Sequence, residues 1–281
     1  MSVEFHQLKV ADVRPETDDS VSITLEVPED LTDRFVHVPG QHLVIRRELG
    51  GEDVRRSYSI CSAPGDGLRV GIKRIPDGVF STWATTELAP GEVLEVMAPI
   101  GEFVTECRAD QARRVVLVAA GSGITPILAM ATTILRDEPA STVTLLYGNR
   151  TSQTIMFHEE LEGLKNRHPE RFRMIHVLSR EPHEVPLFQG RIDGPKLEQL
   201  AGSLLDVDAV DGWYLCGPMA MVEDLSATLA TLGVPDDRIN AELFFDERIE
   251  APPAGDGSAE ADENLIDTRV TIEGRTSVVY V

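Results

Sequence analysis

The fold is decided by the stretch VVLVAAGSGITP, residues 115–126, in which an apolar run leads into a glycine-rich turn. The run Val115–Ala120 is typical of a strand that is buried on both faces of a parallel sheet. The glycines allow the backbone to approach a pyrophosphate, and the N–H groups of a following helix bind its negative charge. Pro126 fits the first turn of that helix, where its missing N–H needs no partner. A nucleotide-binding loop is therefore favoured over an ordinary tight turn.

Strands and helices alternate outward from this stretch toward the C-terminus. We expect further strands at 143–147, 173–178, 212–216 and 239–244, and helices at 126–135, 155–166, 195–205 and 219–232. Such alternation predicts a parallel sheet that is covered by helices on both sides. We interpret residues 112–245 as one α/β domain.

The N-terminal part, residues 1–111, has a different pattern. Short alternating runs are separated by turn signals such as Pro39-Gly40 and Pro90-Gly91, and one short helix is expected at 81–87. Closely spaced short strands of this kind predict an antiparallel β barrel. The fold class is therefore a β barrel followed by a parallel-sheet α/β domain.

Composition and charge narrow the class of protein. The chain has 281 residues, with 26 Lys and Arg against 47 Asp and Glu, and a formal net charge of −21. This length predicts two domains at about 100–200 residues each, and the acidic balance argues against a non-specific nucleic-acid binder. No apolar run approaches the ~18–20 residues of a membrane span, and the N-terminus lacks a basic segment followed by an apolar one. A cytoplasmic protein is expected.

Cysteine and histidine give no sign of a metal site. Cys61, Cys107 and Cys216 are widely spaced and contain no Cys-x-x-Cys pair. We therefore expect neither a disulfide framework nor a bound metal. The seven histidines are scattered singly, and we interpret them as ordinary surface or core side chains.

Three arginines follow or lie near the ends of adjacent predicted strands. Arg150 follows one strand, Ser179-Arg180 follows the next, and Arg191 comes soon after. Planar guanidinium groups bind phosphates well, and an arginine near this position of a dinucleotide fold accommodates a 2′-phosphate. The pattern indicates a phosphate site, with three solvated surface arginines as the alternative.

The segment Arg55–Ile60 joins basic, aromatic and hydroxyl side chains. In a strand, Arg56 and Tyr58 share a face, and Ser59 points to the other side. A cation, an aromatic platform and a hydroxyl donor are what a flavin nucleotide needs. The alternative is an ordinary strand with a surface arginine.

Four motifs occur in the order found in the ferredoxin–NADP⁺ reductase superfamily, and the chain resembles that family from its N-terminus to about residue 245. They are Arg56-x-Tyr58-Ser59, Gly78-x-Phe80-Ser81, Gly121-x-Gly123-x-Thr125-Pro126 and Cys216-Gly217-Pro218. The sequence is most similar to the reductase components of multicomponent oxygenases, such as the phenylacetyl-CoA epoxidase reductase, judging from the fuller segments 56–62, 147–150 and 177–181. Reductases of steroid hydroxylases are similar too.

The resemblance implies an FAD site in the barrel. Arg56 would hold the FAD pyrophosphate, Tyr58 would pack on the flavin ring, and Ser59 would bond near flavin N5. Phe244 would cover the other flavin face. The remaining FAD-binding residues that it implies are Ser57, Ile72, Lys73, Gly78, Val79, Phe80 and Ser81, with Ile72 and Lys73 acting through the backbone.

The resemblance also implies an NADPH site in the second domain and a set of catalytic residues. The nucleotide would contact Gly121, Ser122, Gly123, Ile124, Thr125, Pro126, Arg150, Ser179, Arg180, Arg191, Cys216, Gly217 and Pro218. The catalytic residues would be Ser59, Thr125, Cys216 and Glu242. Considered without the Gly-Pro that follows it, Cys216 reads as a small buried strand residue.

The last residues have a composition of their own. Residues 246–267 contain eight acids and one base and read as an acidic linker. Residues 268–281 resemble the opening hairpin of a plant-type ferredoxin domain, but no cysteines follow that could hold a 2Fe–2S cluster. We therefore expect a chain truncated before that domain.

The expected activity is transfer of electrons from NADPH through FAD, and in a full-length protein through the cluster, to an oxygenase. The oxygenase component would be phenylacetyl-CoA epoxidase or another, such as a steroid or aromatic-ring hydroxylase. A stand-alone NAD(P)H:acceptor reductase and a non-catalytic flavin-binding module are the alternatives.

Overall fold

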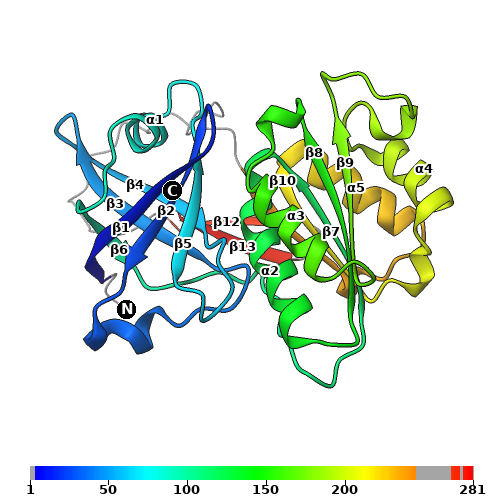
Figure 1. Ribbon diagram of the computed structural model, residues 1–281, viewed down its shortest axis with the longest axis horizontal. Helices are drawn as coiled ribbons and strands as arrows, with labels where there is room; N and C mark the ends of the chain where they lie inside the picture. The colour runs from blue at the N-terminus through cyan, green and yellow to red at the C-terminus, as the bar shows by residue number, and fades with distance from the viewer. Residues whose placement is uncertain (1–3, 245–266, 273–274, 281) are drawn as a thin grey trace.

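The two larger of the three sheets in the described chain stand side by side, one antiparallel and one parallel (Figure 1). The computed structural model describes residues 4–244 in full and the backbone of residues 267–272 and 275–280. Within this described part, no helix has the length and apolar character needed to cross a bilayer.

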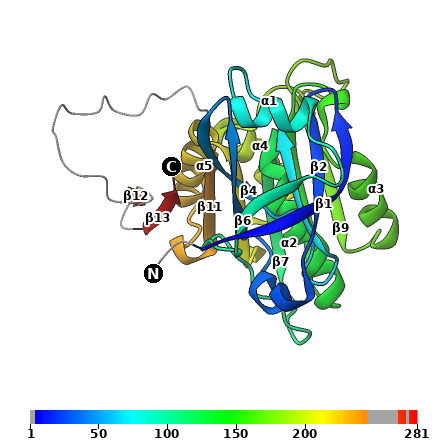
Figure 2. The same cartoon turned by 90° about the vertical axis from the view of Figure 1, so that its left-hand side faces the viewer.

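The first sheet is an antiparallel barrel, as expected. Its spatial order is β4-β3-β6-β1-β2-β5, and an antiparallel bridge between Ile60 and Val70 joins the two outer strands and closes it. Helix α1 (Val79–Thr86) covers one end of the barrel (Figure 2). The strands are β1 (Phe5–Thr17), β2 (Ser20–Glu26), β3 (His42–Leu49), β4 (Glu52–Ser59), β5 (Leu68–Lys73) and β6 (Val93–Met97).

The second sheet is parallel and has the spatial order β11-β10-β7-β8-β9. Helices α2 and α3 pack on the face toward the barrel, and α4 and α5 pack on the other face (Figure 1). The strands are β7 (Arg114–Ala120), β8 (Thr142–Asn149), β9 (Phe172–Leu178), β10 (Gly212–Pro218) and β11 (Ile239–Phe244), and the helices are α2 (Ile124–Asp137), α3 (His158–Arg167), α4 (Gly194–Leu204) and α5 (Met219–Thr231). The strand order reverses at β7, between β8 and β10, which is where such folds bind ligands.

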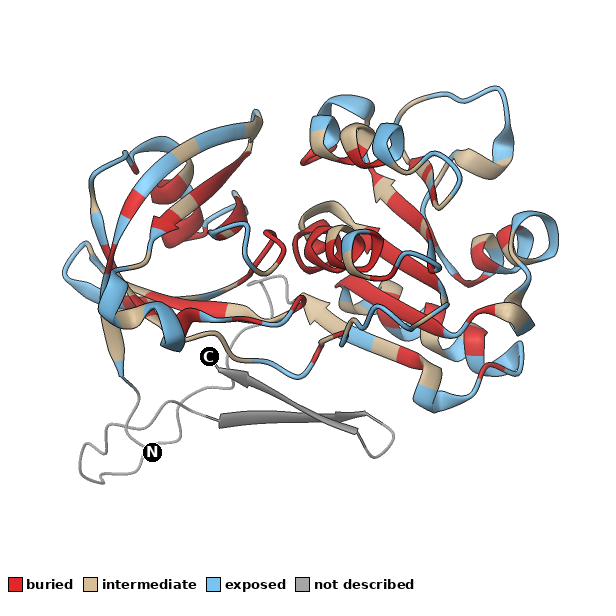
Figure 3. Ribbon diagram, turned by 60° about the horizontal axis from the view of Figure 1, so that its bottom comes forward, coloured by how far each residue is buried: buried red, intermediate tan, exposed pale blue. Residues whose placement is uncertain are grey.

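The barrel is in tight contact with the helices that cover the parallel sheet at Gly71, in β5. A Cβ atom at this position would lie 2.7 Å from Cγ2 of Thr125 and 2.9 Å from Cζ of Phe157. Beside this contact, Arg69 of the barrel forms a two-pronged ion pair with Glu160 of α3, at 2.5 and 2.7 Å. We call these five residues the seam. Helix α2 is buried along most of its length between the two sheets (Figure 3).

The predicted start of α3 was wrong. The helix expected at 155–166 begins only at His158, because Phe157 adopts a left-handed backbone conformation with φ of 55° and follows a short 3-10 turn at Ser152–Thr154. Strands β12 (Asp267–Ile272) and β13 (Arg275–Tyr280) pair antiparallel, as expected of a hairpin. Most of the acidic segment 246–267 lies outside the described residues, and the proposed domain limits stay predictions.

A buried carboxylate ties the end of α2 to the start of β7. Glu138 is fully buried, and its carboxylate accepts hydrogen bonds from Nε and Nη2 of Arg113 and from Oγ of Ser141, the last at 2.6 Å. Arg171 donates to the carbonyl oxygens of Glu138 and Leu135, at 3.0 and 2.7 Å. The bonds from Arg113 and Ser141 compensate the desolvation of the Glu138 carboxylate, and those from Arg171 satisfy backbone carbonyl oxygens at the end of α2.

We predict that Glu138→Ala lowers the free energy of unfolding by about 3–5 kcal/mol, because it leaves the Arg113 charge without its partner. The neighbouring Asp137→Ala is the matched control. Its side chain is 38% exposed in an ion pair with Arg136, so it should cost no more than about 1 kcal/mol. Urea unfolding of both variants measures the difference, and equal losses would contradict this role for Glu138.

Candidate functional site

The glycine-rich turn lies at the carboxyl end of β7, where the strand order reverses. Residues 121–123 form a 3-10 turn that leads into α2, and no side chain caps the helix. Gly121 has φ of 55°, a conformation that favours glycine, with open space where a side chain would stand. A Cβ on Gly123 would overlap the carbonyl oxygen of Cys216. The turn is therefore pressed against β10 on one side and open to a ligand on the other.

Three of the four expected catalytic residues lie together. Ser59 ends β4 of the barrel, and its Oγ donates to Oε2 of Glu242 at 3.2 Å, a bond between residues 183 apart in sequence. The thiol of Cys216 lies 3.9 Å from the same oxygen, because Cys216 and Glu242 are register partners in β10 and β11. We call Ser59, Cys216 and Glu242 the polar triad. It joins the two sheets at one point.

Burial raises the pKa of two members of the polar triad, Glu242 and Cys216. It raises the pKa of the Glu242 carboxyl to about 7, although the bonds from Ser59 and Cys216 act to lower it. Burial, followed by the Glu242 charge, raises the pKa of the Cys216 thiol well above its usual value. The thiol is therefore protonated near neutral pH, whereas Glu242 is able to hold or release a proton there.

Thr125, the fourth expected catalytic residue, belongs to the seam. Its Oγ1 donates to the carbonyl oxygen of Ser122 at 3.0 Å, and its methyl group faces Gly71. Phe244 ends β11 opposite Pro218 and packs partly buried against the core beneath α2. Thr125 and Phe244 therefore lie outside the polar triad. Thr125 is in α2 and Phe244 is in β11, two elements at the junction of the two sheets.

The barrel residues expected to bind FAD lie on β4, β5 and the start of α1. The Tyr58 ring stacks at an angle against buried Phe80, with centroids 5.5 Å apart. Ser81 Oγ accepts from the Ile75 N–H at 3.3 Å and points back toward Gly78, where α1 begins without a side-chain cap. Of the other expected residues, Arg56 and Lys73 are partly exposed, and Ser57 and Val79 are exposed. Ile72 is buried, so only its backbone is available to a ligand.

The arginine cluster forms at the ends of β8 and β9. The N–H of Arg180 donates to the carbonyl oxygen of Arg150 at 2.8 Å, and Ser179 bonds in the same way to Asn149. The Gly190 N–H donates to Leu178, which brings Arg191 to this edge. Arg150, Arg180 and Arg191 are exposed. Within residues 4–244, none of the three forms an ion pair with a carboxylate.

Sequence reasoning missed two features. The first is the seam, for which an isolated glycine in a strand, Gly71, was the available signal, because it marks close backbone approach. The second is a group formed by His158, Glu162 and His176. The spacing of His158 and Glu162 puts both on one helix face, whereas His176 is 18 positions beyond His158, in a strand.

Comparisons with known proteins match both parts of the chain to oxidoreductase domain families. Residues 7–105 match the oxidoreductase FAD-binding domain, and residues 117–227 match the oxidoreductase NAD-binding domain. One of the subunits of 1,2-phenylacetyl-CoA epoxidase from Escherichia coli is 44% identical over 85% of this chain and 68% of its own length. The ferredoxin reductase component of 3-ketosteroid-9-alpha-monooxygenase from Rhodococcus rhodochrous is 34% identical over 84% of this chain and 64% of its own. This chain spans about two thirds of each relative.

Solved structures share the fold. The FAD/NAD-binding domain of nitric oxide dioxygenase from Vibrio cholerae is 26% identical, with a TM-score of 0.73 over 86% of this chain and 99% of that one. A ferredoxin NADP⁺ reductase from Neisseria gonorrhoeae has a TM-score of 0.70 at 22% identity, covering 87% of this chain and all of that one (100%). The latter likeness concerns the fold alone.

We predict a pH-dependent stability that comes from Glu242. Because its pKa of about 7 in the folded state lies above the usual 4.5, its stabilising contribution is complete below pH 4.5 and is lost as the pH rises through 7. Glu242→Gln stays neutral and should gain about 2 kcal/mol of stability relative to the unmodified chain between pH 5 and pH 8. Urea unfolding across this range measures it.

The exposed residue Glu87, in the turn after α1, provides the control. Glu87→Gln makes the same substitution at an exposed position outside the polar triad. A Glu242→Gln variant whose stability follows the same pH curve as the unmodified chain would show that Glu242 does not titrate in this range.

Proposed function

This chain belongs to the ferredoxin–NADP⁺ reductase superfamily and is an FAD-dependent NAD(P)H oxidoreductase. We propose that it passes electrons from NADPH to FAD and that, in a full-length protein with a 2Fe–2S cluster, they continue to an oxygenase component. The observation that carries the proposal is the polar triad, in which a barrel hydroxyl and two parallel-sheet residues meet within hydrogen-bonding reach. A flavin held on the barrel and a nicotinamide held on the parallel sheet meet at such a junction.

The barrel residues fit FAD. The uncapped first turn of α1 offers free backbone N–H groups beside Ser81 for a pyrophosphate, and Arg56 on β4 supplies the cationic contact. The Tyr58 ring packs against Phe80, which fixes its orientation. Phe244 would cover the opposite face of the flavin. When bound, FAD supplies the hydride and single-electron chemistry.

The residues of the parallel sheet fit a nicotinamide nucleotide. The open turn Gly121–Gly123 and the start of α2 offer N–H groups to its pyrophosphate. Cys216, pressed against Gly123, contributes a small neutral side chain where the nicotinamide ring would lie. Glu242 and Ser59 form a path on which a proton is held or moved between Oε2 and Oγ, because the pKa of Glu242 lies near neutrality.

The preference for NADPH over NADH rests on the arginine cluster. Three exposed guanidinium groups without carboxylate partners in the described chain lie near strand ends, in a protein whose net charge is −21. A 2′-phosphate would be drawn to this local positive field.

The acceptor is proposed from the relatives. The 44% identical relative is a subunit of phenylacetyl-CoA epoxidase, and several others are ferredoxin reductase components of a ketosteroid monooxygenase. An oxygenase component of one of these kinds is therefore the proposed partner. The 2Fe–2S ligands that the resemblance implies are absent from these 281 residues, so the proposal for this chain concerns the path from NADPH to FAD.

We predict that the chain binds FAD and that NADPH bleaches the flavin under anaerobic conditions and supports ferricyanide reduction.

Arg56→Ala should weaken FAD binding roughly tenfold to hundredfold, because it removes a charge-assisted bond of about 1.5–3 kcal/mol, and the variant should purify largely colourless. Arg55→Ala, at the neighbouring position in an ion pair with Asp53, is the control and should stay yellow. A yellow chain that NADPH fails to bleach would refute the function, whereas unchanged FAD affinity in Arg56→Ala would refute only that assignment.

We also predict that Arg180→Ala raises the KM for NADPH at least tenfold and changes the KM for NADH little, because only NADPH carries the 2′-phosphate. Arg173→Ala, an exposed arginine near the other end of β9, should affect neither value. Steady-state kinetics with both nucleotides measure the two KM values. An equal rise for NADPH and NADH would mean that Arg180 contributes only to the overall positive electrostatic potential and does not contact the 2′-phosphate.

A further inference from the structure

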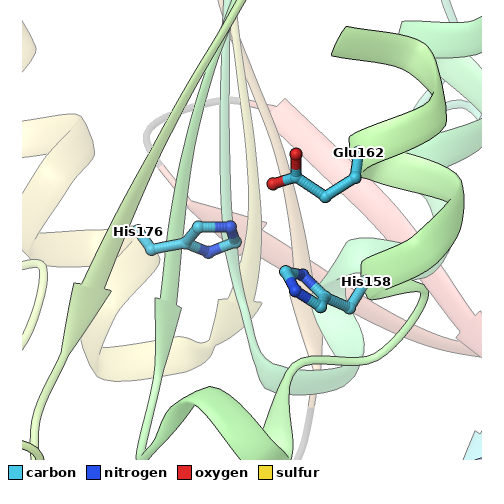
Figure 4. Close-up of side chains that lie close together, drawn as sticks. All are labelled: His158, Glu162 and His176. Atoms are coloured by element: carbon cyan, nitrogen blue, oxygen red, sulfur yellow. The ribbon is translucent and has the colours of Figure 1, made fainter. Parts of the chain in front are cut away.

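Two histidines and a glutamate come together on the outer edge of the parallel sheet. His158 begins α3, Glu162 lies one turn further on, and His176 stands in the middle of β9, the edge strand. Figure 4 shows the two rings and the carboxylate pointing toward one another. One ligand atom from each residue lies within 4.8 Å of the other two.

His176 is left incompletely bonded by the protein. Both of its ring nitrogens are shielded from solvent, and neither has a hydrogen-bond partner in the described part of the chain. Its neighbours are the rings of Tyr147 and His158, at centroid distances of 5.9 and 6.1 Å. A buried imidazole without a partner is costly, and a ligand that satisfies one nitrogen would lower that cost.

We propose that His158, Glu162 and His176 form a binding site for a divalent transition metal, with Zn²⁺ as the best fit. Because the three ligand atoms are at most 4.8 Å apart, some point lies within about 2.8 Å of all of them. Small side-chain rotations reduce this to the ~2.0–2.2 Å of zinc bonds to nitrogen and oxygen. Two imidazoles and one carboxylate suit zinc and leave a fourth position for water, since His158 is exposed.

The site bears on the junction between the two sheets. The residues on either side of His158 are Phe157, which packs against Gly71, and Glu159, which forms an ion pair with Arg14 of β1 at 2.9 Å. Glu160 follows with its bonds to Arg69. A metal held between α3 and β9 fixes the first turn of α3 to its own sheet, and thereby stabilises the helix end that contacts the barrel.

Titration of the FAD-loaded chain with Zn²⁺ tests the site. We expect one Zn²⁺ per chain with micromolar or tighter affinity by calorimetry, and a rise of several degrees in the thermal midpoint. His158→Ala and, separately, Glu162→Gln should weaken binding at least tenfold and abolish the thermal shift. His158 is exposed and Glu162 only partly buried, so both variants should fold.

Two controls exclude other zinc ligands. His183→Ala removes an exposed histidine outside the group, and Cys107→Ser removes the one cysteine that is not buried. Both should bind Zn²⁺ as the unmodified chain does. Absence of binding at about 100 μM Zn²⁺, or equal affinity in the unmodified chain and in His158→Ala, would overturn the proposal.

Discussion

The close approach of the two sheets at Gly71 is the constraint on which the site depends. With no side chain at this position, Thr125 and Phe157 reach the barrel strand, and a Cβ would already meet both. The ion pair between Arg69 and Glu160 closes the contact beside it. Because Ser59 belongs to one sheet and Glu242 to the other, their 3.2 Å hydrogen bond is possible only at this separation.

Buried and partly buried carboxylates have two kinds of donor in this molecule. Glu138 and Glu160 are paired with arginines through two-pronged bonds, which compensates their desolvation. Glu242 receives only neutral donors, a hydroxyl and a thiol, and desolvation prevails, so that its pKa rises. Glu138 and Glu160 are thus each paired with a guanidinium group, whereas the donors to Glu242 are neutral.

Local features were predictable from the sequence, and long-range ones were not. The apolar run and glycine turn at 115–126 specify a strand, a turn and a helix because all three arise from neighbouring residues, and the structure confirms them. Ser59 and Glu242 entered one set of expected catalytic residues only through resemblance to a family, and the hydrogen bond between them, 183 positions apart, was not predicted. The start of α3 was misplaced because the left-handed Phe157 is held by tertiary packing. His176 and α3 come together through sheet topology, which no spacing in the sequence encodes.

The small size of the seam affects how such proteins can be recombined. Its five residues come from three short segments, namely β5, the start of α2 and the turn into α3. A chimera that joins the barrel of one reductase to the parallel-sheet half of another must match these positions, together with the Ser59–Glu242 bond and the Arg14–Glu159 ion pair. A bulkier residue at 71 in the barrel donor would have to be accompanied by smaller ones at 125 and 157 in the other half, so these positions should be exchanged as a unit.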